Sequence, residues 1–176
     1  MLNLQGKNLY LRALEMSDLD FLYALENDTD LWEVSGTNTP YSKKVLQLYL
    51  ENAHRDIYEV KQLRLCICTK KAEVVGLVDL FDFDPKNKRA GIGIVVLQRE
   101  DRSQGVGAEA ISILCDYVFK VLDLHQLYAN VLEDNIASIH LFKKLGFKQI
   151  GIKKDWVYSN GMYKNEVLFQ KMNTCI

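Results

Sequence analysis

Hydrophobic and polar residues follow two different periods along the chain. Alternation over four to eight residues is typical of strands, and recurrence every three to four residues is typical of helices that bury one face. Alternation predicts a strand over residues 8–14, and further segments between polar turns predict strands over residues 63–69, 74–83, 89–97, 126–132, 147–158 and 162–171. The helical pattern predicts helices over residues 17–27, 42–57, 105–121 and 135–145, with Ser17 and Ser42 as N-caps of the first two. Residues 28–41 show no regular period, so we expect them to be irregular.

The predicted order of elements is β-α-α-β-β-β-α-β-α-β-β, and two turn signals support it. Asn160-Gly161 is a dipeptide typical of tight hairpins. Gly146 stands where a helix commonly ends. This order describes a mixed sheet with helices packed on it. The chain has 176 residues and shows no linker-like segment, so we expect one α/β domain over residues 1–176.

Composition and charge exclude several classes of function. The formal net charge is −1, which gives no basic excess for nucleic-acid binding. No apolar run approaches the roughly 20 residues that a membrane helix needs. Residues 1–8 lack the apolar core of a signal peptide, so we expect a cytoplasmic protein. The four cysteines do not have the spacing of zinc ligands. We therefore expect reduced thiols that pack as small hydrophobic groups, and no metal.

Residues 102–107, with the sequence Arg-Ser-Gln-Gly-Val-Gly, join the end of an apolar strand to the start of an amphipathic helix. The two glycines remove side chains where a ligand must approach the backbone. The N–H groups of the first helical turn and the helix dipole favour an anion there. Arg102 adds a planar charged group suited to phosphate oxygens. This turn indicates a site for a phosphate-bearing ligand such as a pyrophosphate.

The turn alone does not specify its ligand. The nucleotide P-loop pattern G-x-x-x-x-G-K-[ST] is absent. Residues 105–110 fit the loose dinucleotide pattern G-x-G-x-x-A, but that pattern normally lies in the first β-α-β unit, and here about 100 residues precede it. A glycine-rich turn without any ligand accounts for the same residues.

The segment Arg102–Gly107 also matches [Q/R]-x-x-G-x-[G/A], the cofactor signature of the GCN5-related N-acetyltransferase (GNAT) superfamily, which this chain resembles. A second block, Asn135–Phe147, resembles the second cofactor helix of that family, opened by Asn and closed by Leu-Gly-Phe. Residues 160–163 resemble the final hairpin of the bacterial spermidine and ribosomal-protein N-terminal acetyltransferase branch. The resemblance covers nearly the whole chain. It implies a GNAT-like α/β fold, with a mixed, mostly antiparallel sheet, a splayed strand pair and flanking helices.

The resemblance also implies acetyl-CoA as the acetyl donor. Its pantetheine arm is expected between the strand that ends at Val96 and the strand over residues 127–132. Its pyrophosphate is expected on the N–H groups of residues 104–108. Asn135 is expected to bond the arm, although it is equally suited to be a plain helix N-cap. The residues expected to contact the donor are Ile94, Val95, Val96, Arg102, Gln104, Gly105, Val106, Gly107, Ala108, Asn135, Ser138 and Phe142.

Acetyl transfer to an alkyl amine requires a group that removes a proton, because such an amine has a pKa near about 10.4. Direct attack is favoured over an acyl-cysteine route, since Cys66 and Cys68 have no identifiable His partner in the sequence. Two positions depart from the enzymes that the chain resembles. Phe142 stands where many carry a Tyr as general acid, and Gly91 stands near where a Glu often serves as base. A thiolate with a pKa near about 8.5 is still a fair leaving group unaided.

Several residues remain as candidates for catalysis and acceptor binding. Asp79 and Asp82 are three apart on a predicted strand, so they point to opposite faces unless a bulge intervenes. The resemblance to the spermidine enzymes favours Asp82. The candidate catalytic residues are Asp82, Ser138 and Tyr163, with Tyr158 as a further hydroxyl. The candidate acceptor-binding residues are Trp32, Glu33, Tyr41 and Asp82.

The sequence therefore predicts an acetyl-CoA-dependent N-acetyltransferase that acts by direct transfer on a primary amine. The acceptor is a small molecule of the polyamine or diamine kind, or the amino group of a peptide. Residues 35–39 lack the acids that polyamine enzymes carry before their Pro-Tyr pair, which weighs against a polyamine. The substitutions at Phe142 and Gly91 motivate an alternative, a catalytically silent acyl-CoA-binding or regulatory module. The spermidine enzymes form large assemblies, so a homo-oligomer is expected here by analogy only.

Overall fold

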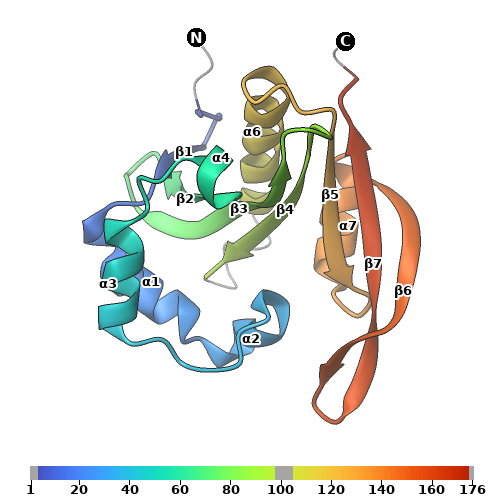
Figure 1. Ribbon diagram of the computed structural model, residues 1–176, viewed down its shortest axis with the longest axis horizontal. Coiled ribbons are helices and arrows are strands. Elements are labelled where there is room, and N and C mark those ends of the chain that lie inside the picture. Colours follow the sequence, from blue (N-terminus) through green and yellow to red (C-terminus); the bar gives the residue numbers. More distant parts are fainter. Residues whose placement is uncertain (1–3, 98–104, 175–176) are drawn as a thin grey trace.

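Seven strands form one sheet in the computed structural model, which describes residues 4–97 and 105–174 (Figure 1). The strand order is β1-β2-β3-β4-β5-β7-β6. Neighbouring strands are antiparallel except β4 and β5, which run parallel. The strands are β1 (Leu9–Ala13), β2 (Leu63–Thr69), β3 (Val74–Asp84), β4 (Arg89–Val96), β5 (Gln126–Leu132), β6 (Lys148–Ser159) and β7 (Met162–Met172).

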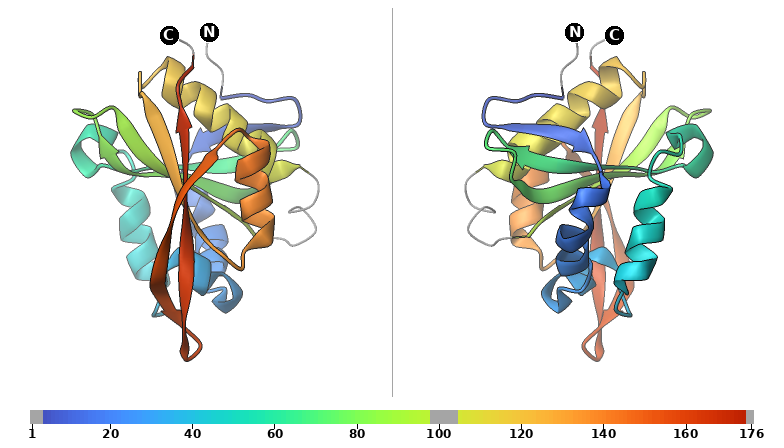
Figure 2. Two further views of the ribbon diagram at one scale, coloured as in Figure 1. Left: turned by 90° about the vertical axis from the view of Figure 1, so that its right-hand side faces the viewer. Right: turned by 90° about the vertical axis from the view of Figure 1, so that its left-hand side faces the viewer.

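Helices cover both faces of the sheet (Figure 2). Helices α6 and α7 lie on one face, and α1, α2 and α3 lie on the other face, beside the N-terminal strands. The helical segments are η1 (Met16–Asp18), α1 (Leu19–Glu26), α2 (Thr29–Ser35), α3 (Lys43–Glu51), α4 (Ile57–Val60), α6 (Val106–Lys120) and α7 (Ile136–Lys144). Within the described ranges, no helix is long and apolar enough to cross a bilayer.

The apolar run over residues 65–68 of β2 reflects burial on both faces of the sheet. Leu65 and Ile67 pack into the core beneath α6 and α7, whereas Cys66 and Cys68 pack against α1 and α3. All four side chains are buried. Strands with two covered faces read as continuous hydrophobic runs rather than as alternation. This part of the sheet is therefore buried between two layers of helices.

Strands β4 and β5 separate after a short paired stretch. They pair at Arg89 with Gln126, Ala90 with Leu127 and Gly91 with Tyr128, and the pairing stops there. Beyond this point β4 continues to Val96 while β5 continues to Leu132. The predicted splayed strand pair is confirmed, and the two strands enclose a wedge-shaped gap in the middle of the sheet.

The strand predictions are close to the structure, whereas three helix predictions are wrong in detail. Ser17 is not an N-cap but lies inside η1, and α1 begins only at Leu19. The region predicted to be irregular contains α2, because the Asp28 side chain accepts a bond from the N–H of Asp30 and Gly36 closes the helix with φ +70°. The second predicted helix stops at Glu51, and α4 is a separate short turn. Ser42 caps α3 as predicted, accepting from the N–H of Val45.

Candidate active site

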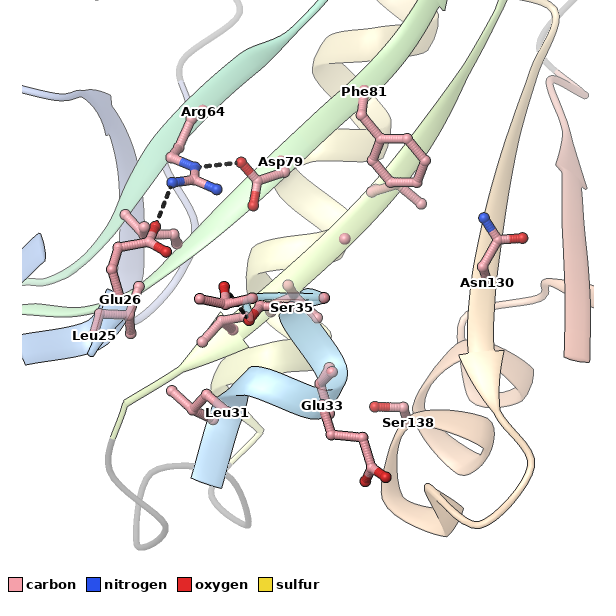
Figure 3. Close-up of a pocket in the computed structure, with 18 of the residues that line it drawn as sticks. Leu25, Glu26, Leu31, Glu33, Ser35, Arg64, Asp79, Phe81, Asn130 and Ser138 are labelled. Atoms are coloured by element: carbon pink, nitrogen blue, oxygen red, sulfur yellow. Dashed lines mark hydrogen bonds and ion pairs between the residues drawn. The ribbon is translucent and has the colours of Figure 1, made fainter. Parts of the chain in front are cut away.

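A cleft of about 650 Å³ opens where β4 and β5 part, and elements from both halves of the chain line it (Figure 3). Gly93, Ile94 and Val95 of β4 form one wall, and residues 130–132 of β5 form the opposite wall. Residues from α1, α2, α3 and α7 and from strands β2, β3, β6 and β7 also line the cleft. The cleft thus lies at the break in the sheet, where backbone groups of the two strands lack their usual partner strand.

The start of α6 carries the predicted anion site. Gly105 is the N-cap residue and has φ +81°, a left-handed conformation that suits glycine. No side chain of the described residues caps this helix. The first helical bond runs from the N–H of Glu109 to the carbonyl of Gly105. The N–H groups of Val106, Gly107 and Ala108 therefore precede the first intrahelical donor and are suited to bind an anion. Arg102 and Gln104 lie outside the described residues.

Space beside this turn is kept open by glycine. Within residues 4–97 and 105–174, a Cβ at Gly105 would meet nothing closer than 4 Å. A Cβ at Gly107 would lie 3.3 Å from Leu141 Cδ2 and 3.7 Å from Ile94 Cδ1. Gly107 therefore permits close packing of α6 against α7 and β4, whereas Gly105 leaves an empty approach to the helix terminus.

Asn135, Ser138 and Phe142 on α7 all line the cleft. The Asn135 side chain accepts a bond from the N–H of Ser138 at 3.1 Å, so it is the N-cap of α7 as well as a cleft residue. Phe142 is only 3% exposed. Its ring packs edge-on against Phe147 and stacks on Phe169, with centroid distances of 5.0 and 6.3 Å. Phe142 is thus a core residue that touches the cleft and offers no proton.

Two carboxylates share one guanidinium at the deep end of the cleft, in what we call the inner cluster (Glu26, Arg64 and Asp79). Arg64 Nε donates to Asp79 Oδ1 at 2.6 Å, and Nη1 donates to Glu26 Oε1 at 2.7 Å (Figure 3). The side chains are 14%, 22% and 17% exposed, in the order Glu26, Arg64 and Asp79. Burial lowers the pKa of Arg64, but the neighbouring carboxylates outweigh burial and hold that pKa above its usual value. The inner cluster therefore keeps one uncompensated negative charge in the cleft wall.

A second set of charges lies at the mouth of the cleft, in what we call the rim cluster (Glu33, Lys164 and Asp134). Lys164 Nζ lies 2.6 Å from Glu33 Oε1 and 2.6 Å from Asp134 Oδ2. This contact joins α2 to β7 and to the loop after β5. Hydrogen bonds from Lys164 and then Ser159 lower the pKa of Glu33. Glu33 and Ser138 approach each other from opposite sides of the mouth (Figure 3).

Phe81 occupies the position beside Gly91. Gly91 pairs with Phe81 on β3, and a Cβ added at Gly91 would lie within 3.0 Å of three ring carbons of Phe81. The ring also meets Tyr128 edge-on, with centroids 5.8 Å apart. A side chain at residue 91 is thus excluded while the ring keeps its place. The absence of a glutamate there follows from the aromatic ring, which itself lines the cleft.

Four of the predicted residues lie away from the cleft. Asp82 has φ +49° within a bulge of β3 and accepts a bond from the Tyr128 hydroxyl at 3.1 Å, in a separate shallow concavity. Tyr158 and Tyr163 face each other on the exposed β6–β7 hairpin and are 66% and 64% exposed. The Trp32 indole donates to the carbonyl of Glu26 at 2.9 Å, which fastens α2 to the end of α1.

The structure therefore brings together only part of the predicted site. Ile94, Val95, Asn135, Ser138, Phe142, Glu33 and Tyr41 line the cleft. Val96 is buried beside it and is 8% exposed. Of the two aspartates on β3, the structure places Asp79 in the cleft and Asp82 outside it. Asp82, which the resemblance favoured, lies beside a bulge of β3 and lines the second concavity, so its role in acceptor binding stays a prediction.

The described cysteines are unsuited to act as nucleophiles. Cys66, Cys68 and Cys115 are free and buried. Burial raises the pKa of Cys66 to about 12 and the pKa of Cys115 to about 11, and it also raises the pKa of Cys68. Because the thiolate is the nucleophilic form, these groups remain inert thiols at neutral pH. Their state agrees with the predicted direct transfer of the acetyl group.

Three cleft residues were not predicted from the sequence: Glu26, Arg64 and Glu166. Arg64 left a signal, since it is the one charge within the apolar strand Leu63–Thr69. A charge in a strand that is buried on both faces requires a partner. Glu26 at the end of α1 and Glu166 within β7 carry no comparable local signal, because polar residues are ordinary at both kinds of position.

Known acetyltransferases are similar to this chain in both sequence and fold. A family model described as an acetyltransferase (GNAT) domain matches residues 8–148. Spermidine N(1)-acetyltransferase of Escherichia coli strain K12 is 30% identical over 158 residues, covering 89% of this chain and 82% of the relative. The Vibrio cholerae enzyme of the same name is 28% identical over 162 residues, covering 91% and 90%. A crystal structure of Vibrio cholerae spermidine N-acetyltransferase in complex with CoA and spermine has a TM-score of 0.85 at 25% identity, over 95% of this chain and 96% of that chain.

Proposed function

This chain belongs to the GNAT family of acetyltransferases, and we propose that its acceptor is a small alkyl diamine or polyamine. The chain is an acetyl-CoA-dependent N-acetyltransferase, as its named relatives are. The alternative of a catalytically silent acyl-CoA-binding module receives no support from these relatives. The observation that carries the acceptor class is the inner cluster, in which two carboxylates share a single cation.

The residues present fit acetyl-CoA. The gap between β4 and β5 gives room for an extended arm, and Gly105 leaves the N-terminus of α6 open to an anion. We propose that residues 105–108 hold the pyrophosphate and that Ile94, Val95 and Asn135 hold the arm. When bound, the donor supplies an acetyl group activated as a thioester. Ser138 lies one helical turn before Phe142 on α7, and we propose that its hydroxyl serves where a tyrosine hydroxyl was expected.

The charges of the cleft favour a cationic acceptor. Four carboxylates, Glu26, Glu33, Asp79 and Glu166, and one cation, Arg64, are among the described residues that line it. An alkyl amine with a pKa near about 10.4 arrives as an ammonium ion. A partly desolvated carboxylate attracts such a cation more strongly than a fully solvated one does. Asp79 and Glu26 therefore hold one ammonium of a diamine at the deep end of the cleft, and a carboxylate oxygen or a bound water accepts the proton of its other, reacting amine.

A panel of amines tests this acceptor class. Thiol release from acetyl-CoA is measured with 1,4-diaminobutane, spermidine, spermine, butylamine and a peptide with a free amino terminus. We expect the di- and polyamines to exceed butylamine and the peptide by about tenfold in kcat/KM, the equivalent of one charge-assisted contact. A faster reaction with the peptide than with every alkyl amine would refute the proposal.

Paired substitutions on β3 locate the ammonium. Asp79→Asn should raise KM for diamines about tenfold without changing the affinity for CoA, because it removes the charge from the cleft. Glu26→Gln should act in the same direction. Asp82→Asn is the matched control, since Asp82 lies outside the cleft. Equal effects of Asp79→Asn and Asp82→Asn would show that distant charge, rather than contact, attracts the acceptor.

A further inference from the structure

Lys164 is an internal ammonium ion at the mouth of the cleft. It extends from β7 and lies 2.6 Å from carboxylate oxygens of Glu33 and Asp134. Its side chain is 16% exposed, and the Glu33 oxygen that it meets is itself buried from solvent. The ion-pair contacts with Asp134 and Glu33 raise the pKa of Lys164, so it stays charged at neutral pH. Glu33, which lines the cleft, is thus already bound to a cation of the protein's own.

The outer wall of the cleft repeats this arrangement. Glu166 lines the cleft from β7 and forms an ion pair with Lys153 of β6. Lys153 also lies over the ring of Trp156, at 4.7 Å from its centroid, so the lysine is held on two sides. Each of the two cleft carboxylates on this side is therefore paired with a different lysine, although Lys164 also contacts Asp134, which is not among the residues that line the cleft. In the inner cluster, by contrast, both cleft carboxylates, Glu26 and Asp79, share Arg64.

Among the described residues, the cleft carboxylates that share a single cation lie in the inner cluster, at one end of the cleft. The remaining acid of the rim cluster, Asp134, is 53% exposed, so water and salt screen it. A second ammonium of a long acceptor would have to displace Lys164 from Glu33 in order to gain the same kind of contact. Exchange of one ion pair for an equivalent one contributes little free energy. A long acceptor thus gains little from its distal charge.

We propose that Lys164 determines acceptor length: it occupies the place of a second acceptor ammonium at Glu33, so the site selects short diamines over longer polyamines. This inference rests on the proposed function, because it names which members of the acceptor class the cleft prefers. Lys164 is a specificity determinant that acts through Glu33 and takes no part in the acetyl transfer itself.

Equilibrium binding tests the inference without turnover. Calorimetry measures the affinity of 1,4-diaminobutane and of spermine for the protein loaded with CoA. Lys164→Met should raise the spermine affinity about three- to tenfold, because Glu33 becomes available to the distal ammonium, and should leave the 1,4-diaminobutane affinity within about twofold. Lys164→Arg keeps the cation and should retain the wild-type pattern. Lys154→Met removes the same charge from an exposed site on the same hairpin and should also leave the pattern unchanged.

The double variant Glu33→Gln/Lys164→Met separates charge masking from a structural effect. If Lys164 masks Glu33, the gain in spermine affinity disappears in the double variant. A gain that persists would mean that loss of Lys164 loosens α2, and the inference would be overturned. An unchanged spermine affinity in Lys164→Met, in a variant with the wild-type melting temperature, would also overturn it. If the wild type neither binds nor acetylates any alkyl amine, the proposed function is refuted, and the inferred preference for short acceptors is refuted with it.

Discussion

Adding one methyl group at Gly91 should destabilise the fold, whereas the same change at Gly93 should not. Both glycines lie on β4, and both face the ring of Phe81. A Cβ at Gly91 would lie within 3.0 Å of three ring carbons, a distance that real Cβ atoms essentially never show. A Cβ at Gly93 would have its nearest neighbour, Phe81 Cε1, at 3.9 Å, which is ordinary van der Waals contact. The two positions therefore differ mainly in their distance from one ring.

The expected magnitude follows from this comparison. Replacing Gly by Ala in a strand reduces the conformational entropy of the unfolded chain, which stabilises a protein by about 0.4–1 kcal/mol where the geometry permits it. This gain applies to both variants and cancels in their difference. Overpacking a well-packed site costs about 1–3 kcal/mol. Gly91→Ala should thus be less stable than Gly93→Ala by about 1–3 kcal/mol, which for a chain of this size is about 2–12 °C in Tm.

Urea unfolding followed by tryptophan fluorescence measures the free energy of unfolding of both variants. The double variant Gly91→Ala/Phe81→Leu provides the internal check, because the smaller side chain removes the clash. We expect this double variant to recover most of the loss, a non-additivity of the kind seen for residues in contact. Equal stability of Gly91→Ala and Gly93→Ala would refute the reasoning. It would mean that Phe81 turns aside at little cost, and that its ring does not explain why residue 91 carries no side chain.

The donor site and the proton route give two further predictions. Gly105→Ala and Gly161→Ala both place Ala at φ +81° and should each lose about 1–2 kcal/mol of stability. Only Gly105→Ala should weaken CoA binding, by about tenfold in calorimetry, because its methyl group enters the approach to α6. Equal CoA affinities in these two variants would contradict the anion site. Ser138→Ala should lower kcat about tenfold with KM for the amine within about twofold, since a general acid typically contributes at least this much. An unchanged kcat in steady-state kinetics would remove Ser138 from the proton route.

The elements that the sequence predicts well are those whose turns and apolar periodicity are determined by neighbouring residues. The hairpin turn at Asn160-Gly161 is present, with both residues in the left-handed conformation that such turns require. Strands β2 and β5 have the predicted bounds, because apolar periodicity and flanking polar turns agree there. Helix α2 was missed although Asp28 and Gly36 are a recognisable cap and stop. Between these two residues the chain is too short to show a helical period.

The donor side of the site is easier to predict than the acceptor side for a physical reason. The proposed donor side depends on backbone N–H groups at one helix end, and the glycines at that end are separated by a single residue. The acceptor side is assembled from α1, β2, β3 and β7, which are far apart in the chain. Its charges, such as Glu26 and Arg64, are 38 residues apart and meet only after the sheet has formed. Local sequence patterns do not reveal such long-range contacts.

The pairing of Arg64 with Asp79 illustrates how one residue of register decides the site. At the turn between β2 and β3, the N–H of Thr69 bonds the carbonyl of Glu73, and Cys68 pairs with Val74. Continued without interruption, this register would place Arg64 opposite Val78. A bulge between Ile67 and Cys68 shifts the register by one, so that Arg64 pairs with Asp79 instead. Because a shift of one residue exchanges the two faces of a strand pair, the bulge brings the cation beside the carboxylate on the cleft face. The acidic end of the cleft therefore depends on an irregularity of the ladder, and the ion pair in turn stabilises that register against the unshifted one.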